Sequence, residues 1–220
     1  MNESGKITLS EQIYRQLRRD IITQKIPCGA KLTLQTLKEH FGVSHTPIRD
    51  ALTRLNEEGI ITYYSNCGVN VVSFTEQDIR ELYQLAAELD SLSVQFCRYS
   101  YSSTPLISEM EELLTTSAQL LEQGDIETWQ GNSEDFHLLF YHHANNHYLY
   151  EAASRIQAKL ALLSNLYRSS ENIAKIQEEH QAIFNAIRQD DYNLASDLMR
   201  KHTQDDVVLA LKAYRQFLNT

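Results

Sequence analysis

Helical periodicity dominates this chain of 220 residues, and it is interrupted once, directly after Gly59. Before that glycine, apolar residues recur at the spacing of three short helices. After it, segments 60–64 and 69–72 alternate in the manner of two strands that flank a turn. From Thr75 to Thr220 we find no convincing strand alternation. The sequence therefore predicts a helix–helix–helix–hairpin module followed by an all-helical region.

Capping residues mark where the three short helices begin. Thr8 opens a capping box, and Thr33 and Ser44 are placed to cap the second and third helices. Gly42 closes the second helix, and Pro47 lies in the first turn of the third, where proline is tolerated. Three short helices and a hairpin are the arrangement of a winged helix-turn-helix.

The predicted fold class is mainly α, with two domains. Residues 1–74 would form the winged helix-turn-helix and residues 75–220 an all-helical bundle that binds an effector and dimerises. Six bundle helices are expected, at about 76–100, 105–123, 126–145, 147–167, 171–188 and 191–217.

The charge is distributed unevenly between these parts. The whole chain carries −9, but residues 1–70 hold nine Lys and Arg against seven Asp and Glu, and the remainder holds eleven against twenty-two. Such asymmetry is typical of a DNA-reading module joined to a domain that does not bind DNA.

Targeting features are absent from the sequence. No apolar run approaches the roughly 18 residues of a membrane span, and the first ten residues lack the apolar core of a secretory signal. Cys28, Cys67 and Cys97 are far apart and form no CxxC pair. We expect a cytoplasmic protein with reduced thiols.

The first turn of the third helix carries short polar and cationic side chains. A helix that enters the major groove needs such residues at its start and a rigid apolar back face. Ser44, His45, Thr46 and Arg49 supply the first requirement. The alternative is that Ser44 is only a helix cap and Arg49 a solvated surface charge.

The stretch from Gly42 to Leu52, Gly-Val-Ser-His-Thr-Pro-Ile-Arg-Asp-Ala-Leu, resembles the GntR family of regulators. The similarity continues through Glu58-Gly59-Ile60-Ile61 and a wing glycine, and covers most of residues 10–72. The resemblance implies that the DNA contacts come from the following residues: Gln35, Ser44, His45, Thr46, Arg49 and Gly68.

Two of these positions depart from the family pattern, because His45 and Gln35 stand where arginine is usual. A bidentate arginine–guanine pair contributes roughly 1–3 kcal/mol of discrimination, whereas a neutral histidine makes at most one such bond. We expect the operator to differ from common family sites at the base that His45 faces.

Three histidines, His137, His180 and His202, each lie beside apolar helix positions. Three imidazoles in the interior of one bundle suit zinc or nickel. A histidine on an apolar face is also frequently a hydrogen-bonded core residue, and spacing alone leaves both interpretations open.

Residues 76–217 resemble the FCD ligand-binding domain of FadR-type GntR regulators, through Phe136-His137, Glu179-His180 and the segment that leads to His202. The resemblance implies that these histidines and an acidic residue hold a divalent ion that helps to bind a carboxylate effector. Ser133 occupies the acidic position, and Ala86 stands where many members have an effector-binding arginine. Both departures predict an altered pocket.

We therefore expect a homodimeric regulator, a repressor rather than an enzyme, that binds double-stranded DNA at a palindromic operator. A small-molecule effector would modulate its affinity, through a metal held by His137, His180 and His202. The alternative is a metal-dependent hydrolase with a three-histidine zinc site.

Overall fold

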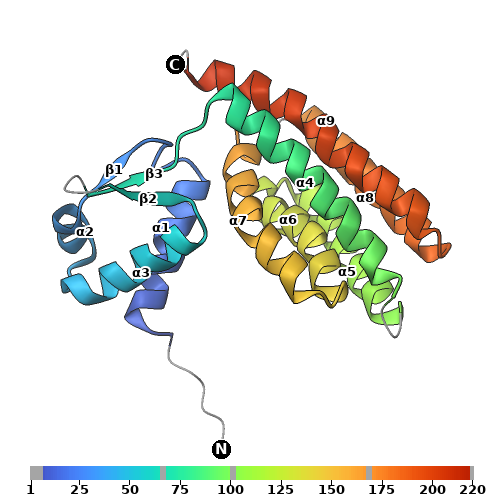
Figure 1. Cartoon of the computed structure of the whole chain (residues 1–220), viewed down its shortest axis with the longest axis horizontal. Coiled ribbons are helices and arrows are strands. Elements are labelled where there is room, and N and C mark those ends of the chain that lie inside the picture. The colour runs from blue at the N-terminus through green and yellow to red at the C-terminus, as the bar shows by residue number, and fades with distance from the viewer. Residues whose placement is uncertain (1–6, 65–67, 100–102, 167–169, 219–220) are drawn as a thin grey trace, which may run out of the picture. The chain divides into compact units, whose positions relative to one another are not determined.

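The computed structural model describes residues 7–64, 68–99, 103–166 and 170–218 (Figure 1). Two compact units divide the chain: Met1–Thr75 with Ser154–Asn165, and Glu76–Ala153 with Leu166–Thr220.

The N-terminal part of the first unit, before Thr75, contains three helices and a small sheet, and the unit also includes the second part of α7 (His147–Ser164). The helices are α1 (Leu9–Ile22), α2 (Leu34–Phe41) and α3 (His45–Glu57), and the strands are β1 (Lys31–Leu32), β2 (Ile61–Tyr64) and β3 (Gly68–Val71). The strand order is β1-β3-β2, with both pairs antiparallel. This is the predicted winged helix-turn-helix with one addition, because β1 was not expected.

Hydrophobic periodicity could not predict the strand β1, because it is only two residues long. Its register pairs Lys31 with Asn70 and Leu32 with Val69. A single buried position, Leu32, cannot establish an alternation. The strand exists because β3 offers it a free edge, which is a tertiary effect. The predicted turn at 65–67, with Cys67, lies outside the described residues.

The core of the first unit consists of aliphatic residues at helical spacing. Its most deeply buried members are Ile13, Leu17, Ile21, Ile48, Leu52, Leu55, Ile60 and Ile61. Full burial of each such side chain contributes roughly 1.5–3 kcal/mol relative to exposure. Two of the predicted caps form: the hydroxyls of Thr8 and Thr33 accept hydrogen bonds from the backbone N–H of Glu11 and Thr36.

The second unit is an all-helical bundle. Its helices are α4 (Glu76–Cys97), α5 (Thr104–Gln123), α6 (Ile126–His143), α8 (Ser170–Arg188), α9 (Tyr192–Leu218) and the start of α7 (His147–Ser164). The long helices α4 and α9 run side by side (Figure 1). The six predicted helices are confirmed, with ends that fall within three residues of the expected positions.

A large apolar cluster fills the bundle, and a smaller one surrounds Trp129. Buried residues of α4, α5, α6, α8, α9 and the start of α7 form the large cluster, which includes Phe136, Phe140 and Met199. Trp129 is fully buried against Ile173 and Ile176. In the described residues, no helix is long and apolar enough to cross a membrane.

Candidate functional site

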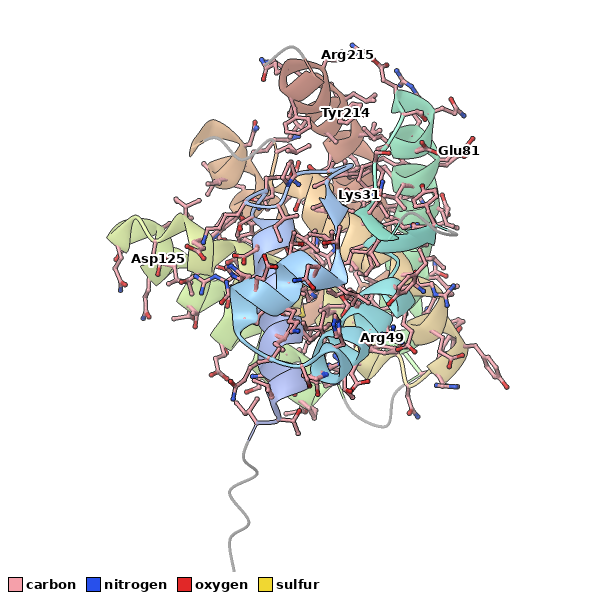
Figure 2. The ribbon with its side chains drawn as sticks, turned by 90° about the vertical axis from the view of Figure 1, so that its left-hand side faces the viewer. Lys31, Arg49, Glu81, Asp125, Tyr214 and Arg215 are labelled. Carbon is pink, nitrogen blue, oxygen red and sulfur yellow. The ribbon has the colours of Figure 1, made fainter. Side chains whose placement is uncertain are left out.

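The first turn of α3 presents the predicted DNA-contacting residues to solvent. His45, Thr46 and Arg49 are exposed, whereas Ile48 and Leu52 on the opposite face are almost fully buried. Figure 2 places Arg49 on this helix. Because the back face is locked into the core, the polar first turn is held on a rigid support, as insertion into a groove requires.

Some basic side chains of this unit form ion pairs with acidic residues, and others do not. Arg54 pairs with Glu11 and lies 3.8 Å from the ring centroid of Tyr14, and Arg18 pairs with Glu58 at 2.9 Å. Among the residues that the structure describes, Arg49 has no acidic partner. The Arg49 guanidinium is therefore available to bind a phosphate or a guanine edge.

Ser44 precedes α3 directly, and Gln35 lies on the neighbouring helix α2. Ser44 is the N-cap residue of α3, as predicted, but its side chain makes no capping hydrogen bond, so this part of the prediction is wrong. Gln35 is exposed on α2 and donates a hydrogen bond of 2.5 Å to Glu39. Sequence patterns locate a cap position but not the rotamer of the capping side chain.

Gly68 has a structural role in the wing. Its φ is +94°, and an added Cβ would lie 3.1 Å from the carbonyl oxygen of Leu32. Glycine is thus required for β3 to turn tightly beside β1. The sequence predicted a close approach to DNA at this position, and the structure gives an additional reason for the glycine.

Three histidines from three helices meet inside the bundle. His137 of α6, His180 of α8 and His202 of α9 each offer a ring nitrogen, and these atoms all lie within 4.8 Å of one another. The Nε2 of His202 is 3.3 Å from Nε2 of His180 and 3.2 Å from Nε2 of His137. The residues that sequence reasoning selected are therefore brought together.

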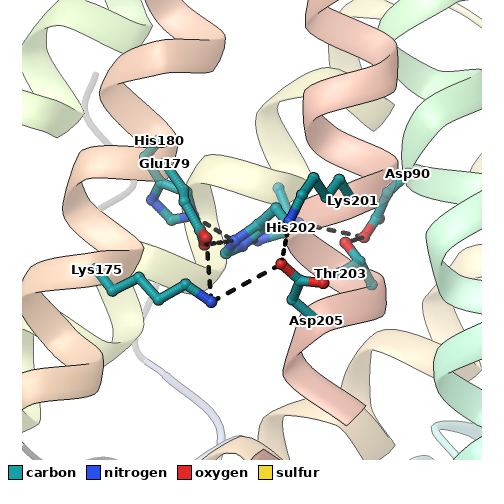
Figure 3. A network of polar contacts seen from close by, with 9 residues as sticks. Asp90, Lys175, Glu179, His180, Lys201, His202, Thr203 and Asp205 are labelled. Carbon is teal, nitrogen blue, oxygen red and sulfur yellow. Dashed lines mark hydrogen bonds and ion pairs between the residues drawn. The ribbon is translucent and has the colours of Figure 1, made fainter. Parts of the chain in front are cut away.

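Carboxylates lie behind two of the imidazoles (Figure 3). Nδ1 of His202 is 2.7 Å from Oε2 of Glu179, and Nδ1 of His137 is 3.3 Å from Oδ2 of Asp90. A carboxylate at Nδ1 favours the tautomer that carries its proton there and leaves the Nε2 lone pair available to an ion.

Asp90 is a buried charge with several donors. It is 1% exposed, and it accepts hydrogen bonds of 2.6 Å from Tyr141 and 2.8 Å from Thr203. Burial raises the pKa of Asp90, but the neighbouring His137 and the hydrogen bonds from Tyr141 and Thr203 hold it below its usual value. The group is therefore a carboxylate rather than a neutral acid at neutral pH.

Glu179 links the histidines to the bundle surface. Lys175 contacts Glu179 at 3.3 Å and Asp205 at 3.9 Å (Figure 3). Burial raises the pKa of Glu179, but the hydrogen bond with His202 and the charges of His202 and Lys175 lower it further than burial raises it. Burial lowers the pKa of His202, but the hydrogen bond with Glu179 and the charges of Asp206, Glu179 and Asp90 outweigh it, so the net shift is upward.

Two of the three separations between the histidine donor atoms fit a tetrahedral ion, and all three atoms lie within 4.8 Å of one another. Two nitrogens bound to one zinc at about 2.0–2.1 Å lie about 3.3–3.4 Å apart in tetrahedral geometry. The two Nε2 separations, 3.2 and 3.3 Å, match that spacing. The ring of His180 stacks on Phe136 with centroids 4.1 Å apart, which fixes its orientation. The residues present could therefore hold zinc or nickel with one coordination position left open.

Asp90 is the site residue that sequence reasoning missed. Its neighbours on the buried face of α4 are Ala86, Ala87, Ser91 and Val94. An acidic residue in the middle of an apolar face was the signal that could have identified it. Its partners Tyr141 and Thr203 are 51 and 113 residues away in sequence, so spacing could not name them.

Two family descriptions match the chain. "Bacterial regulatory proteins, gntR family" matches residues 9–71, and "FCD domain" matches residues 81–205. Curated relatives include the HTH-type transcriptional repressor GlaR of Escherichia coli, 24% identical over 86% of this chain and 90% of its own length. The uncharacterized HTH-type transcriptional regulator YdhC of Bacillus subtilis is 24% identical over 89% of this chain and 88% of its own.

Solved structures share the fold. E. coli McbR/YncC superposes with a TM-score of 0.76 at 21% identity, covering 96% of this chain and all of that one. A putative GntR regulator from Rhodococcus sp. RHA1 also has a TM-score of 0.76, at 20% identity over 93% of this chain and 98% of that one. Both curated relatives named above are described as transcriptional regulators or repressors, and neither is described as a hydrolase.

Proposed function

The chain belongs to the GntR family of bacterial transcriptional regulators, with a helix-turn-helix domain and an FCD domain, and we propose that it is an effector-responsive repressor. A homodimer would place two α3 helices in successive major grooves of a palindromic operator. The main support for the proposal is Arg49, which is exposed, forms no ion pair with a described acidic residue, and lies on a helix whose opposite face is buried.

Operator binding is tested with DNA from upstream of the protein's own gene. We expect a protected segment with two-fold symmetry and a stoichiometry of two chains per site. Arg49→Ala is expected to weaken binding about 5- to 150-fold, the range for loss of one good arginine contact. Arg98→Ala removes an exposed arginine just beyond α4 and serves as the matched control. Equal affinities of the two variants would contradict the assignment of Arg49.

The second part of the proposal concerns what controls DNA binding. His137, His180 and His202 would hold zinc or nickel, and a small carboxylate would complete the coordination. The matching Nε2 separations and the carboxylates behind two of the imidazoles support this assignment. An ion supplies a positive centre for an anionic ligand, while the bundle supplies orientation and excludes water.

Metal analysis of the purified protein tests this second part. We expect about one zinc or nickel ion per chain, lost in His137→Ala. Operator affinity is then measured with and without the ion, and with a panel of small carboxylates. An ion content that is unchanged in His137→Ala would overturn the metal assignment and leave the DNA-binding proposal intact.

A further inference from the structure

Asp90 is as deeply buried as His180, and it connects α4 to the site. Its two oxygens have different partners: Oδ1 accepts from Tyr141 of α6, and Oδ2 accepts from Thr203 of α9 and faces Nδ1 of His137. The carboxylate is 1% exposed, so water does not compete for these contacts. Burying a carboxylate destabilises the fold unless hydrogen bonds or an opposite charge compensate for the lost hydration.

The three donor atoms of the cluster are imidazole nitrogens and carry no negative charge of their own. Ser133, one helical turn before His137, is uncharged, and three neutral imidazoles leave a divalent ion with its full charge of +2. Asp90 and Glu179 contribute one negative charge each, and each faces the far nitrogen of a histidine. These two carboxylates, together with Asp206, which also acts on His202, would balance the charge of the ion without contacting it directly.

We propose that Asp90 is a positioning residue for the histidine-held ion: it fixes the tautomer of His137 and supplies, from behind the ring, part of the charge that balances the metal. The inference rests on the metal site proposed above. It assigns to a buried residue of α4 the compensating role that a carboxylate at position 133 would otherwise fill by direct ligation. It also predicts an all-nitrogen protein ligand set, which favours zinc, nickel or copper over manganese or magnesium.

The test compares two nearly isosteric variants that each disturb Asp90 in a different way. Asp90→Asn removes the charge and can present an N–H to Nδ1 of His137, which forces the proton to Nε2. Tyr141→Phe removes one hydrogen bond to Oδ1 and leaves the carboxylate opposite His137 in place. Both variants lose a buried hydrogen bond, so both are expected to lose about 1–3 kcal/mol of stability. Only the first should lose metal affinity.

Zinc affinity is measured by competition with a chromophoric chelator, using Zn²⁺ alone and the full chain. Asp90→Asn is expected to bind zinc about 10- to 100-fold more weakly than wild type, the usual effect of losing a partner of a metal-binding histidine. Tyr141→Phe is expected to stay within about threefold of wild type. Circular dichroism and thermal unfolding of the metal-free proteins establish that both variants fold.

Imidazole nitrogen NMR of the metal-free chain reports the tautomer of His137, which would not change if Asp90 only stabilised the fold. The proton of neutral His137 should reside on Nδ1 in wild type and in Tyr141→Phe, and should shift toward Nε2 in Asp90→Asn. Wild-type zinc affinity in a folded Asp90→Asn variant would overturn the inference while leaving the metal site intact. Absence of zinc binding in wild type would overturn both.

Discussion

The Nε2 atoms of His137 and His202 face each other at 3.2 Å, while Nδ1 of each ring faces a carboxylate. If both rings carry their proton on Nδ1, two nitrogen lone pairs point at one another across this gap. Such an arrangement is unfavourable unless a cation, either a proton or a metal ion, lies between them. The arrangement of the cluster therefore favours a bound positive charge.

Metal addition is expected to stabilise the protein against unfolding. An ion that binds only the folded chain, at about 100 times its dissociation constant, adds about 2.7 kcal/mol to the free energy of unfolding. Urea unfolding with and without zinc measures the difference. His180→Gln removes one ligand while keeping a polar side chain of similar size, and should abolish the effect. A variant stabilised as much as wild type would show that zinc acts elsewhere on the chain.

A carboxylate at position 133 is expected to change which metal binds. Ser133 lies four residues before His137 on α6 and is buried, so Ser133→Asp places an oxygen ligand on the same helical face. Oxygen donors favour harder ions, so the affinity for Mn²⁺ should rise relative to that for Zn²⁺. Competitive binding of the two ions measures the ratio. Ser117→Asp, at another buried serine of the bundle, is the control for adding charge to the core.

The DNA specificity of the protein is expected to depend on His45. His45→Arg restores a bidentate donor at the start of α3, so binding-site selection should recover a guanine at the contacted position. The preference for guanine over other bases should increase about 5- to 150-fold, which corresponds to about 1–3 kcal/mol. Selection of the same operator by both proteins would show that His45 does not read a base.

Cys97 is expected to resist alkylation in the folded protein. Its thiol is buried and donates to the carbonyl of Phe140 at 3.3 Å, and burial raises its pKa to about 12. At pH 8 only about one molecule in 10⁴ would then carry the reactive thiolate. Burial also raises the pKa of Cys28, which is less deeply buried. Iodoacetamide labelling, read by mass spectrometry, should therefore modify Cys97 only after denaturant is added, and rapid labelling of the native chain would contradict this.

Periodicity predicted the architecture because it reports which face of an element is buried. The inward residues of α3 and the six bundle helices follow from apolar spacing alone, and the structure confirms them. The strand β1 could not be predicted in this way, since two residues carry no period and their pairing with β3 depends on tertiary structure.

The histidine site could be predicted in part. His137, His180 and His202 were identified by their apolar neighbours and by resemblance, and the structure brings them within 4.8 Å. The roles of Asp90 and Glu179 could not be derived, because they depend on which ring nitrogen faces which carboxylate. That information belongs to rotamers and helix packing, not to spacing along the chain.

Trp129 is the only tryptophan in the chain, and it is fully buried in the small cluster of the second unit. Fluorescence excited at the red edge of the protein spectrum therefore arises from the helical bundle alone, while the winged helix-turn-helix remains silent. A titration with metal, effector or denaturant can be followed in one domain without any label. Combined with a fluorophore on operator DNA, this gives two independent optical signals, one for each half of the regulator.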